Sequence, residues 1–144
     1  MKQKVAIETI YFLLILLFAY AAFSKLLDYT AFKAQLGNSP FVRSFAGVIA
    51  WLIPTIELII VGMLTVKDTR IMGLYSSLVL LMIFTLYIAG MLLSGEDLPC
   101  SCGGIISTLS WKQHLVFNLF FMALSIVGIG LWWKQKQDIL IINK

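Results

Sequence analysis

The chain has 144 residues, of which 60% are hydrophobic and 12% are charged, and its formal net charge is +4. A soluble domain carries about 25% charged residues, so this composition excludes an ordinary soluble domain. It predicts a single domain, residues 1–144, whose apolar surface is covered by a lipid bilayer. The basic residues stand at the ends of apolar runs and form no stripe with aromatic residues, which argues against a nucleic-acid partner.

Four apolar runs follow one another at residues 5–23, 44–66, 71–93 and 113–133. Each is long enough to cross a hydrocarbon core of about 30 Å, which takes about 20 helical residues. No run shows the alternating pattern of a membrane barrel. The sequence therefore predicts an all-α membrane protein, a bundle of four transmembrane helices. The first run is too long for a typical signal peptide and lacks a clear cleavage site, so we expect it to be retained.

The connection between the first two runs, residues 25–43, is more than a plain loop. Apolar residues recur in it at helical spacing, and the segment ends in Gly37, Asn38, Ser39 and Pro40. This pattern predicts a short amphipathic helix that lies in the membrane interface. Such a helix would roof one end of the bundle.

Lysine and arginine residues are unevenly shared between the two ends of the predicted bundle. One side holds seven of them and the other side four, and cytoplasmic loops carry the excess. This bias predicts that both termini lie in the cytoplasm of a bacterium. The connection between the third and fourth runs then faces the periplasm from the inner membrane, on the side where thiols are kept oxidised.

Glu57 stands near the middle of the second run, three residues after Pro54. A charged side chain at this depth costs at least about 2.5 kcal/mol on insertion scales. We therefore expect Glu57 to face the bundle interior, with either a partner or a functional role. The plainer alternative is a packing hydrogen bond to a Ser, Thr or Tyr of a neighbouring span.

Other polar residues stand in the first and fourth runs, several of them near the predicted periplasmic side. His114, Asn118 and Ser125 share one face of the fourth run, a face expected to point inward. His114 is a candidate for stabilising a thiolate or moving a proton, against the alternative of a simple interfacial residue. Ser24 and Lys25 close the first run, and Lys25 would lower the pKa of a nearby cysteine thiol.

The only two cysteines, Cys100 and Cys102, stand one residue apart between Pro99 and a pair of glycines. In extended backbone their Cα atoms would be roughly 6.5–7 Å apart, at the upper limit of disulfide geometry. A disulfide here would close a very small ring and would be labile. The pair therefore predicts redox chemistry. A zinc site fits poorly, because Asp97 and His114 could join the two cysteines as ligands but the spacing of the four matches no zinc pattern. Copper capture and inert thiols stay open as alternatives.

Three short motifs, in this order, resemble one known family. They are FSKLLD at residues 23–28, PTIE at 54–57 and PCSCGG at 99–104. Over residues 18–132 the chain resembles the methylamine-utilisation protein MauE, within the wider DoxX-like group of four-span membrane proteins. The resemblance implies a redox-associated role, in which the protein supports disulfide formation or maturation of exported proteins beside a thioredoxin-like partner.

One position departs from that pattern, because Ser101 stands where many relatives have glycine between the cysteines. The aromatic residue that follows the pair in relatives is also missing, which leaves the turn and the partner preference open. The architecture is similar to quinone-linked thiol oxidases of the vitamin K epoxide reductase and DsbB type. Those proteins use a second cysteine pair, which this chain lacks. Electrons would therefore pass to a partner protein or directly to a membrane carrier such as a quinone.

The leading hypothesis is a membrane thiol–disulfide oxidoreductase with Cys100 and Cys102 as its catalytic residues and no metal. Its partner would be a thioredoxin-like or exported cysteine-containing protein. The expected supporting residues are Ser24, Lys25, Glu57, Pro99 and His114. Two rival hypotheses are a non-catalytic subunit of a larger envelope complex, and a small-solute or metal transporter with Glu57 on its path.

Overall fold

The computed structural model describes residues 2–94 and 110–142, and all regular structure within these ranges is helical. The prediction of an all-α protein with four long helices and a short one between the first two is confirmed. The long helices are α1 (Lys2–Leu27), α3 (Ala46–Thr65), α4 (Arg70–Ser94) and α5 (Trp111–Ile142). The short elements are helix α2 (Tyr29–Asn38) and the 3₁₀ turns η1 (Arg43–Phe45) and η2 (Lys67–Thr69).

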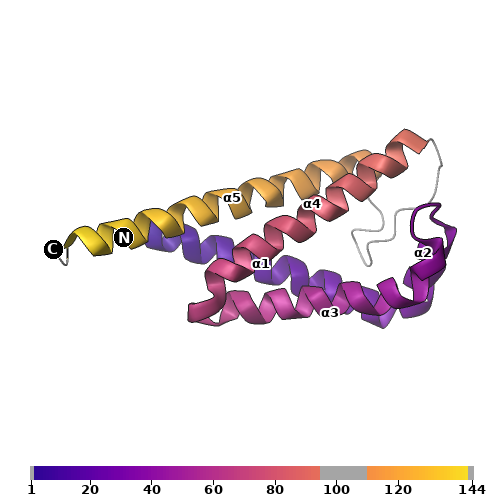
Figure 1. The fold of residues 1–144 in the computed structure, drawn as a ribbon, viewed down its shortest axis with the longest axis horizontal. Helices are drawn as coiled ribbons and strands as arrows, with labels where there is room; N and C mark the ends of the chain where they lie inside the picture. The colour runs from indigo at the N-terminus through magenta and orange to yellow at the C-terminus, as the bar shows by residue number, and fades with distance from the viewer. Residues whose placement is uncertain (1, 95–109, 143–144) are drawn as a thin grey trace.

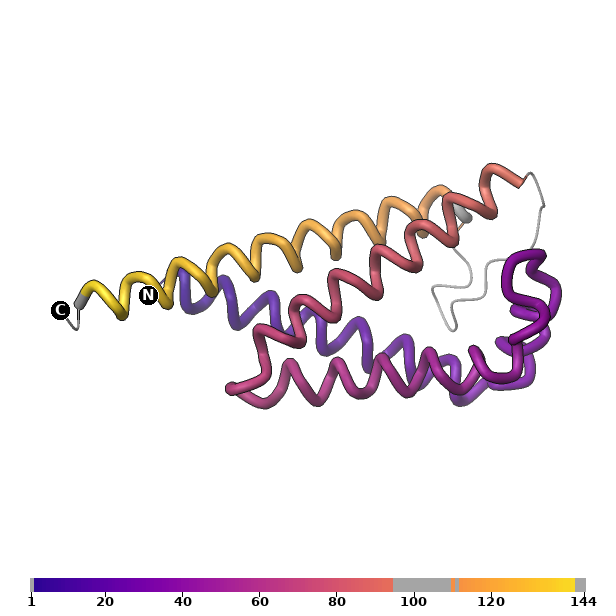
Figure 2. Tube along the Cα trace, viewed as in Figure 1, coloured from indigo at the N-terminus to yellow at the C-terminus, as the bar shows by residue number. Residues whose placement is uncertain are grey.

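The four long helices run alternately up and down, and each packs against two others (Figure 1). Contacts join α1 to α3, α3 to α4, α4 to α5, and α5 back to α1, so the helices form a closed ring. Both marked ends of the chain lie at one end of the bundle, and α2 lies at the other (Figure 2). We call these the terminal end and the α2 end.

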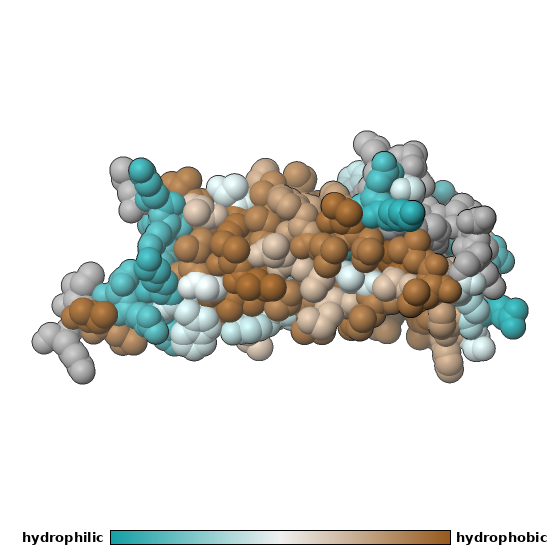
Figure 3. Space-filling model, turned by 90° about the horizontal axis from the view of Figure 1, so that it is seen from above, coloured by the Kyte–Doolittle hydropathy of each residue, from teal (hydrophilic) through white to brown (hydrophobic). Residues whose placement is uncertain are grey.

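All four long helices are long and apolar enough to cross a membrane. On the face drawn in Figure 3, hydrophobic side chains form a broad band across the middle of the molecule, and hydrophilic residues gather toward its two ends. A surface of this kind is stable only in contact with lipid. The chain is therefore a multi-pass membrane protein.

The fourth long helix, α5, is longer than the fourth apolar run of the sequence. It continues past Trp133 to Ile142, and its 32 residues span about 48 Å at 1.5 Å per residue. No glycine or proline follows Trp133 to stop the helix, and the residues that do follow are mostly good helix formers. Hydropathy identifies only the membrane-embedded part of a helix, whereas the helix itself continues as long as its residues have high helix propensity.

A capping box begins α5 at Ser110. The Ser110 backbone N–H donates a hydrogen bond to Gln113 Oε1 (2.9 Å), and the Gln113 N–H donates one to Ser110 Oγ (3.3 Å). This reciprocal pair satisfies two of the N–H groups that a helix start leaves without partners. It also sets His114 in the first turn of α5.

A close contact holds α3 and α4 together near η2. A Cβ atom added to Gly73 would lie 2.9 Å from Leu64 Cδ2 and 3.0 Å from the Leu64 backbone nitrogen. Only glycine fits at this crossing. From there the two helices diverge toward the α2 end (Figure 1).

Candidate functional site

A buried ion pair joins α1 to α3. Lys25 Nζ, from the last turn of α1, lies 2.8 Å from Glu57 Oε1, which comes from the middle of α3. The two residues are 4% and 1% exposed. Glu57 thus faces the bundle interior, and its partner is a cation, in place of the hydroxyl group considered from the sequence.

Lys25 is held by more than its carboxylate. Its Nζ also donates a hydrogen bond to the Ala21 carbonyl oxygen (3.3 Å). The rings of Phe32 and Phe84 lie with their centroids 5.8 Å from the same nitrogen, where the face of an aromatic ring attracts a cation. The sequence had linked Lys25 to the cysteines, whereas the structure places it against Glu57.

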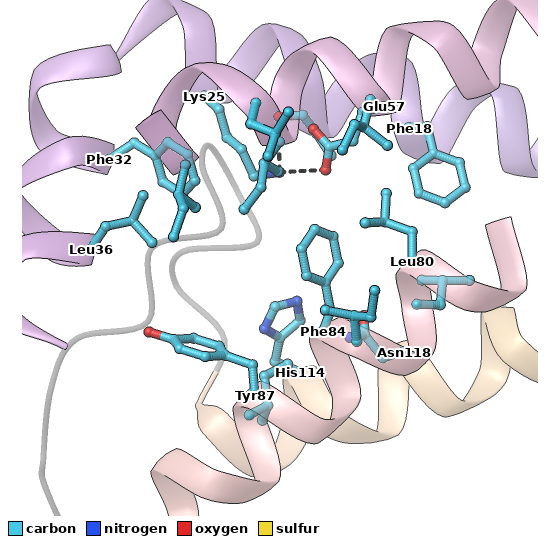
Figure 4. Close-up of a pocket in the computed structure, with 18 of the residues that line it drawn as sticks. Phe18, Lys25, Phe32, Leu36, Glu57, Leu80, Phe84, Tyr87, His114 and Asn118 are labelled. Atoms are coloured by element: carbon cyan, nitrogen blue, oxygen red, sulfur yellow. Dashed lines mark hydrogen bonds and ion pairs between the residues drawn. The ribbon is translucent and has the colours of Figure 1, made fainter. Parts of the chain in front are cut away.

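The ion pair forms part of the wall of a cavity of about 360 Å³. All five helices contribute to the wall, which is mostly apolar (Figure 4). The polar side chains along it are Lys25, Gln35, Glu57, Tyr87, His114 and Asn118. The volume lies within the range of about 300–1,000 Å³ that is typical of small-molecule sites.

His114 and Asn118 form the α5 side of the cavity. They lie one helical turn apart and are 5% and 3% exposed. Figure 4 shows both on the wall across from Lys25 and Glu57. The face of α5 that carries His114 and Asn118 therefore points into the bundle, as expected from the sequence. Ser125 lies further along the same face and is fully buried.

Three buried side-chain atoms lack a hydrogen-bond partner among the described residues. They are Gln35 Oε1, Glu57 Oε2 and Asn118 Nδ2, and all three residues line this one cavity. A buried polar atom without a partner costs about 1–3 kcal/mol. Its presence in a folded protein calls for an explanation, and a ligand is one.

The remaining expected site residues divide into two groups. Cys100, Cys102 and Pro99 lie outside the described residues. Ser24 is half-buried in the last turn of α1 and does not belong to the cavity wall. The connection that carries the cysteines leaves α4 after Ser94, at the α2 end of the bundle (Figure 1).

Sequence reasoning did not find the α2 and α4 parts of the cavity. Gln35 of α2 and Phe84 of α4 line it, yet neither was singled out. A glutamine in an amphipathic segment is ordinarily solvated, and aromatic residues in a span ordinarily pack in its core. The usable signal was that Gln35 lies between Phe32 and Leu36, on the face of the short helix that is buried.

The family model of methylamine utilisation protein MauE matches residues 3–132 of the chain. No curated protein and no solved structure matches it.

Proposed function

The chain belongs to the MauE family of membrane proteins, named for methylamine utilisation, and on that premise we propose that it is a thiol–disulfide oxidoreductase or redox-maturation factor. It exchanges disulfides through Cys100 and Cys102 with an exported or thioredoxin-like protein. It resides in the bacterial inner membrane, with the cysteines on the periplasmic side.

The observation that supports this proposal most is where the cysteine-bearing connection attaches. Met91, one turn before the end of α4, and His114, in the first turn of α5, both line the cavity that holds the Lys25–Glu57 pair. The connection that carries the two cysteines therefore starts and ends within about one helical turn of residues that line this cavity. Charged groups beside a redox pair assist its chemistry, which supports a role for the cysteines at this end of the bundle.

The exchange follows ordinary thiol–disulfide chemistry. A thiolate of the partner attacks one sulfur of the Cys100–Cys102 disulfide and forms a mixed disulfide, and the other sulfur leaves as a thiolate. A second thiol of the partner then attacks the mixed disulfide. The partner gains a disulfide, and Cys100 and Cys102 are left reduced.

The proposed orientation rests on charge. Six basic residues lie at the terminal end within the described ranges, and they are Lys2, Lys4, Lys67, Arg70, Lys134 and Lys136. An excess of lysine and arginine is typical of the cytoplasmic side of a membrane protein. The α2 end, with the connection that carries the cysteines, would then face the periplasm.

Mixed-disulfide trapping tests the exchange. Cys100→Ser and Cys102→Ser variants are expressed in cells, quenched with acid, and run on non-reducing gels with mass spectrometry of the shifted bands. At least one variant should accumulate a disulfide-linked adduct with an exported or thioredoxin-like protein. The double variant is the matched control and should show no adduct, and the absence of adducts from both single variants contradicts the proposal.

The buried ion pair also favours a second candidate, a small-solute or metal transporter with Glu57 on its path. In that case Glu57→Gln would abolish uptake, whereas the double Cys→Ser variant would retain it. A purely structural subunit of an envelope complex would retain its function in both variants.

A further inference from the structure

The cavity wall presents a donor and an acceptor from opposite sides, and the described residues satisfy neither. Glu57 Oε2 comes from α3 and Asn118 Nδ2 from α5, and Figure 4 shows the two residues across the cavity from each other. A carboxylate oxygen only accepts hydrogen bonds, and an amide nitrogen only donates them. A ligand that satisfies both atoms therefore donates a hydrogen bond at one end and accepts one at the other.

Charge and wall composition restrict the ligand further. Lys25 and Glu57 are in contact and cancel each other's charge, which favours an uncharged ligand. Apart from the polar groups already named, the wall is apolar, and it includes the rings of Phe18, Phe32, Phe84 and Phe117. Such a wall favours a flat ring, because aromatic rings pack well against one another.

The side of the bundle gives the ligand a route from the lipid. Leu52 of α3 and Ile83 of α4 line the cavity, yet they are 50% and 54% exposed. Leu52 precedes Leu64 in α3 and Ile83 follows Gly73 in α4, so both lie on the α2 side of the close contact between these helices. A single layer of side chains thus touches both the cavity and the lipid-facing surface, so a membrane-soluble molecule has only side chains to displace.

From these observations we propose that the cavity binds a para-hydroquinone, a membrane quinol, which enters from the bilayer between α3 and α4. One hydroxyl donates a hydrogen bond to Glu57 Oε2, and the oxygen on the far side of the ring accepts one from Asn118 Nδ2. The oxidised quinone has carbonyl oxygens only and leaves Glu57 Oε2 without a donor. The site therefore binds the reduced form more tightly than the oxidised form.

The redox meaning of this site rests on the proposed function, although the binding does not. Oxidation of two cysteine thiols to a disulfide releases two electrons and two protons. A quinone that takes up both becomes a quinol, the form that the cavity fits better. Cys100 and Cys102 would then pass their electrons to the quinone directly, without a second cysteine pair.

The test compares ligands on the purified full chain in nanodiscs. Decylubiquinol, kept reduced under anaerobic conditions, decylubiquinone and 1-dodecanol are titrated by isothermal calorimetry. The quinol should bind about tenfold more tightly than the quinone, about the worth of one hydrogen bond. Equal affinity for the quinol and dodecanol would overturn the proposal, since it would show a nonspecific lipid site.

Variants locate the binding. Asn118→Leu should weaken the quinol about tenfold, and Glu57→Gln, which puts an amide donor in place of an acceptor, should shift the preference toward the quinone. Ser125→Ala, a buried position on the same face of α5 and outside the cavity wall, is the control and should bind as wild type. If Glu57→Gln does not fold, Asn118→Leu still decides, because unchanged quinol affinity in that variant overturns the proposal.

One further variant separates this inference from the proposed function. The Cys100→Ser/Cys102→Ser protein should keep its quinol affinity, since the site is built from other residues. Retained binding without any trapped mixed disulfide would leave the quinol site standing and remove the oxidoreductase. Trapped adducts without quinol binding would do the opposite.

Discussion

Lys25 and Glu57 form an ion pair whose environment makes it far more consequential than an ordinary surface pair. Both charges are buried, one in α1 and one in α3, within a bundle that lipid surrounds. Water would normally stabilise each charge, and here only the other charge and a few dipoles do so. Removal of one partner therefore leaves the other in an apolar site, which typically costs about 3–5 kcal/mol.

A double-mutant cycle tests this at the level of stability. Glu57→Leu and Lys25→Met alone should each lower the free energy of unfolding by about 3–5 kcal/mol. The double variant should lose much less than the sum, because it leaves no isolated charge. The measurement is denaturant unfolding in detergent micelles, monitored by circular dichroism. Additive losses in the double variant would contradict the expected coupling.

The chain contains its own control for that cycle. Arg70 lies 2.6 Å from Glu8, but the Glu8 side chain is 50% exposed. Exposed pairs contribute about 0–1 kcal/mol. Glu8→Gln should therefore change the free energy of unfolding by less than about 1 kcal/mol, in the same assay.

The sequence predicts one half of this pair better than the other. Glu57 interrupts an apolar run, so its burial and its need for a partner follow from the cost of a charge in lipid. Lys25 stands at the end of the first run, where a lysine ordinarily extends toward the headgroups. Its pairing depends on the depth at which α1 packs against α3, which no local pattern in the sequence states.

At the scale of elements, the α3–α4 pair is closed at one end and open at the other. Gly73 lets α4 approach Leu64 closely beside η2, and the divergence beyond this contact leaves room for the cavity. The same two helices thus supply both a tight crossing and a binding site. We expect the crossing to hold the angle between them.

A methyl group added at Gly73 tests the close contact. Gly73→Ala places a Cβ atom against the Leu64 backbone and should lower the free energy of unfolding by about 1–3 kcal/mol, as overpacking does. Gly62→Ala is the matched control, since an added Cβ there meets nothing within 4 Å. That variant should be neutral or slightly stabilising, because alanine favours helix over glycine. Equal effects in thermal unfolding would refute the role of the close contact.

Helix extents show where sequence patterns stop being informative. Hydropathy located both ends of α1, α3 and α4 and the start of α5 within a few residues, and the amphipathic pattern of residues 25–43 correctly indicated α2. Hydropathy missed the extension of α5 to Ile142, because polar residues can continue a helix without raising the hydropathy of the segment. The order of the helices around the ring was not predictable either, since every span is apolar on several faces.

At the scale of the whole molecule, the orientation in the membrane is a prediction that rests on charge. It can be tested in a Cys100→Ser/Cys102→Ser background with one new cysteine at a time. Lys33→Cys, exposed on α2 at one end, should react with a membrane-impermeant maleimide in cells whose outer membrane is permeable. Lys136→Cys, exposed near the end of α5, should react only after the inner membrane is opened. The reverse pattern would invert the topology.

The contact between Lys25 and Glu57 has one more consequence, which concerns the voltage across the membrane. A transmembrane potential does work on net charge, about 2.3 kcal/mol per elementary charge per 100 mV. Two opposite charges held 2.8 Å apart present almost no net charge to that field, and an uncharged ligand adds none. Occupancy of the cavity is then set by the pool of molecules dissolved in the lipid, and the electrical state of the cell leaves it unchanged.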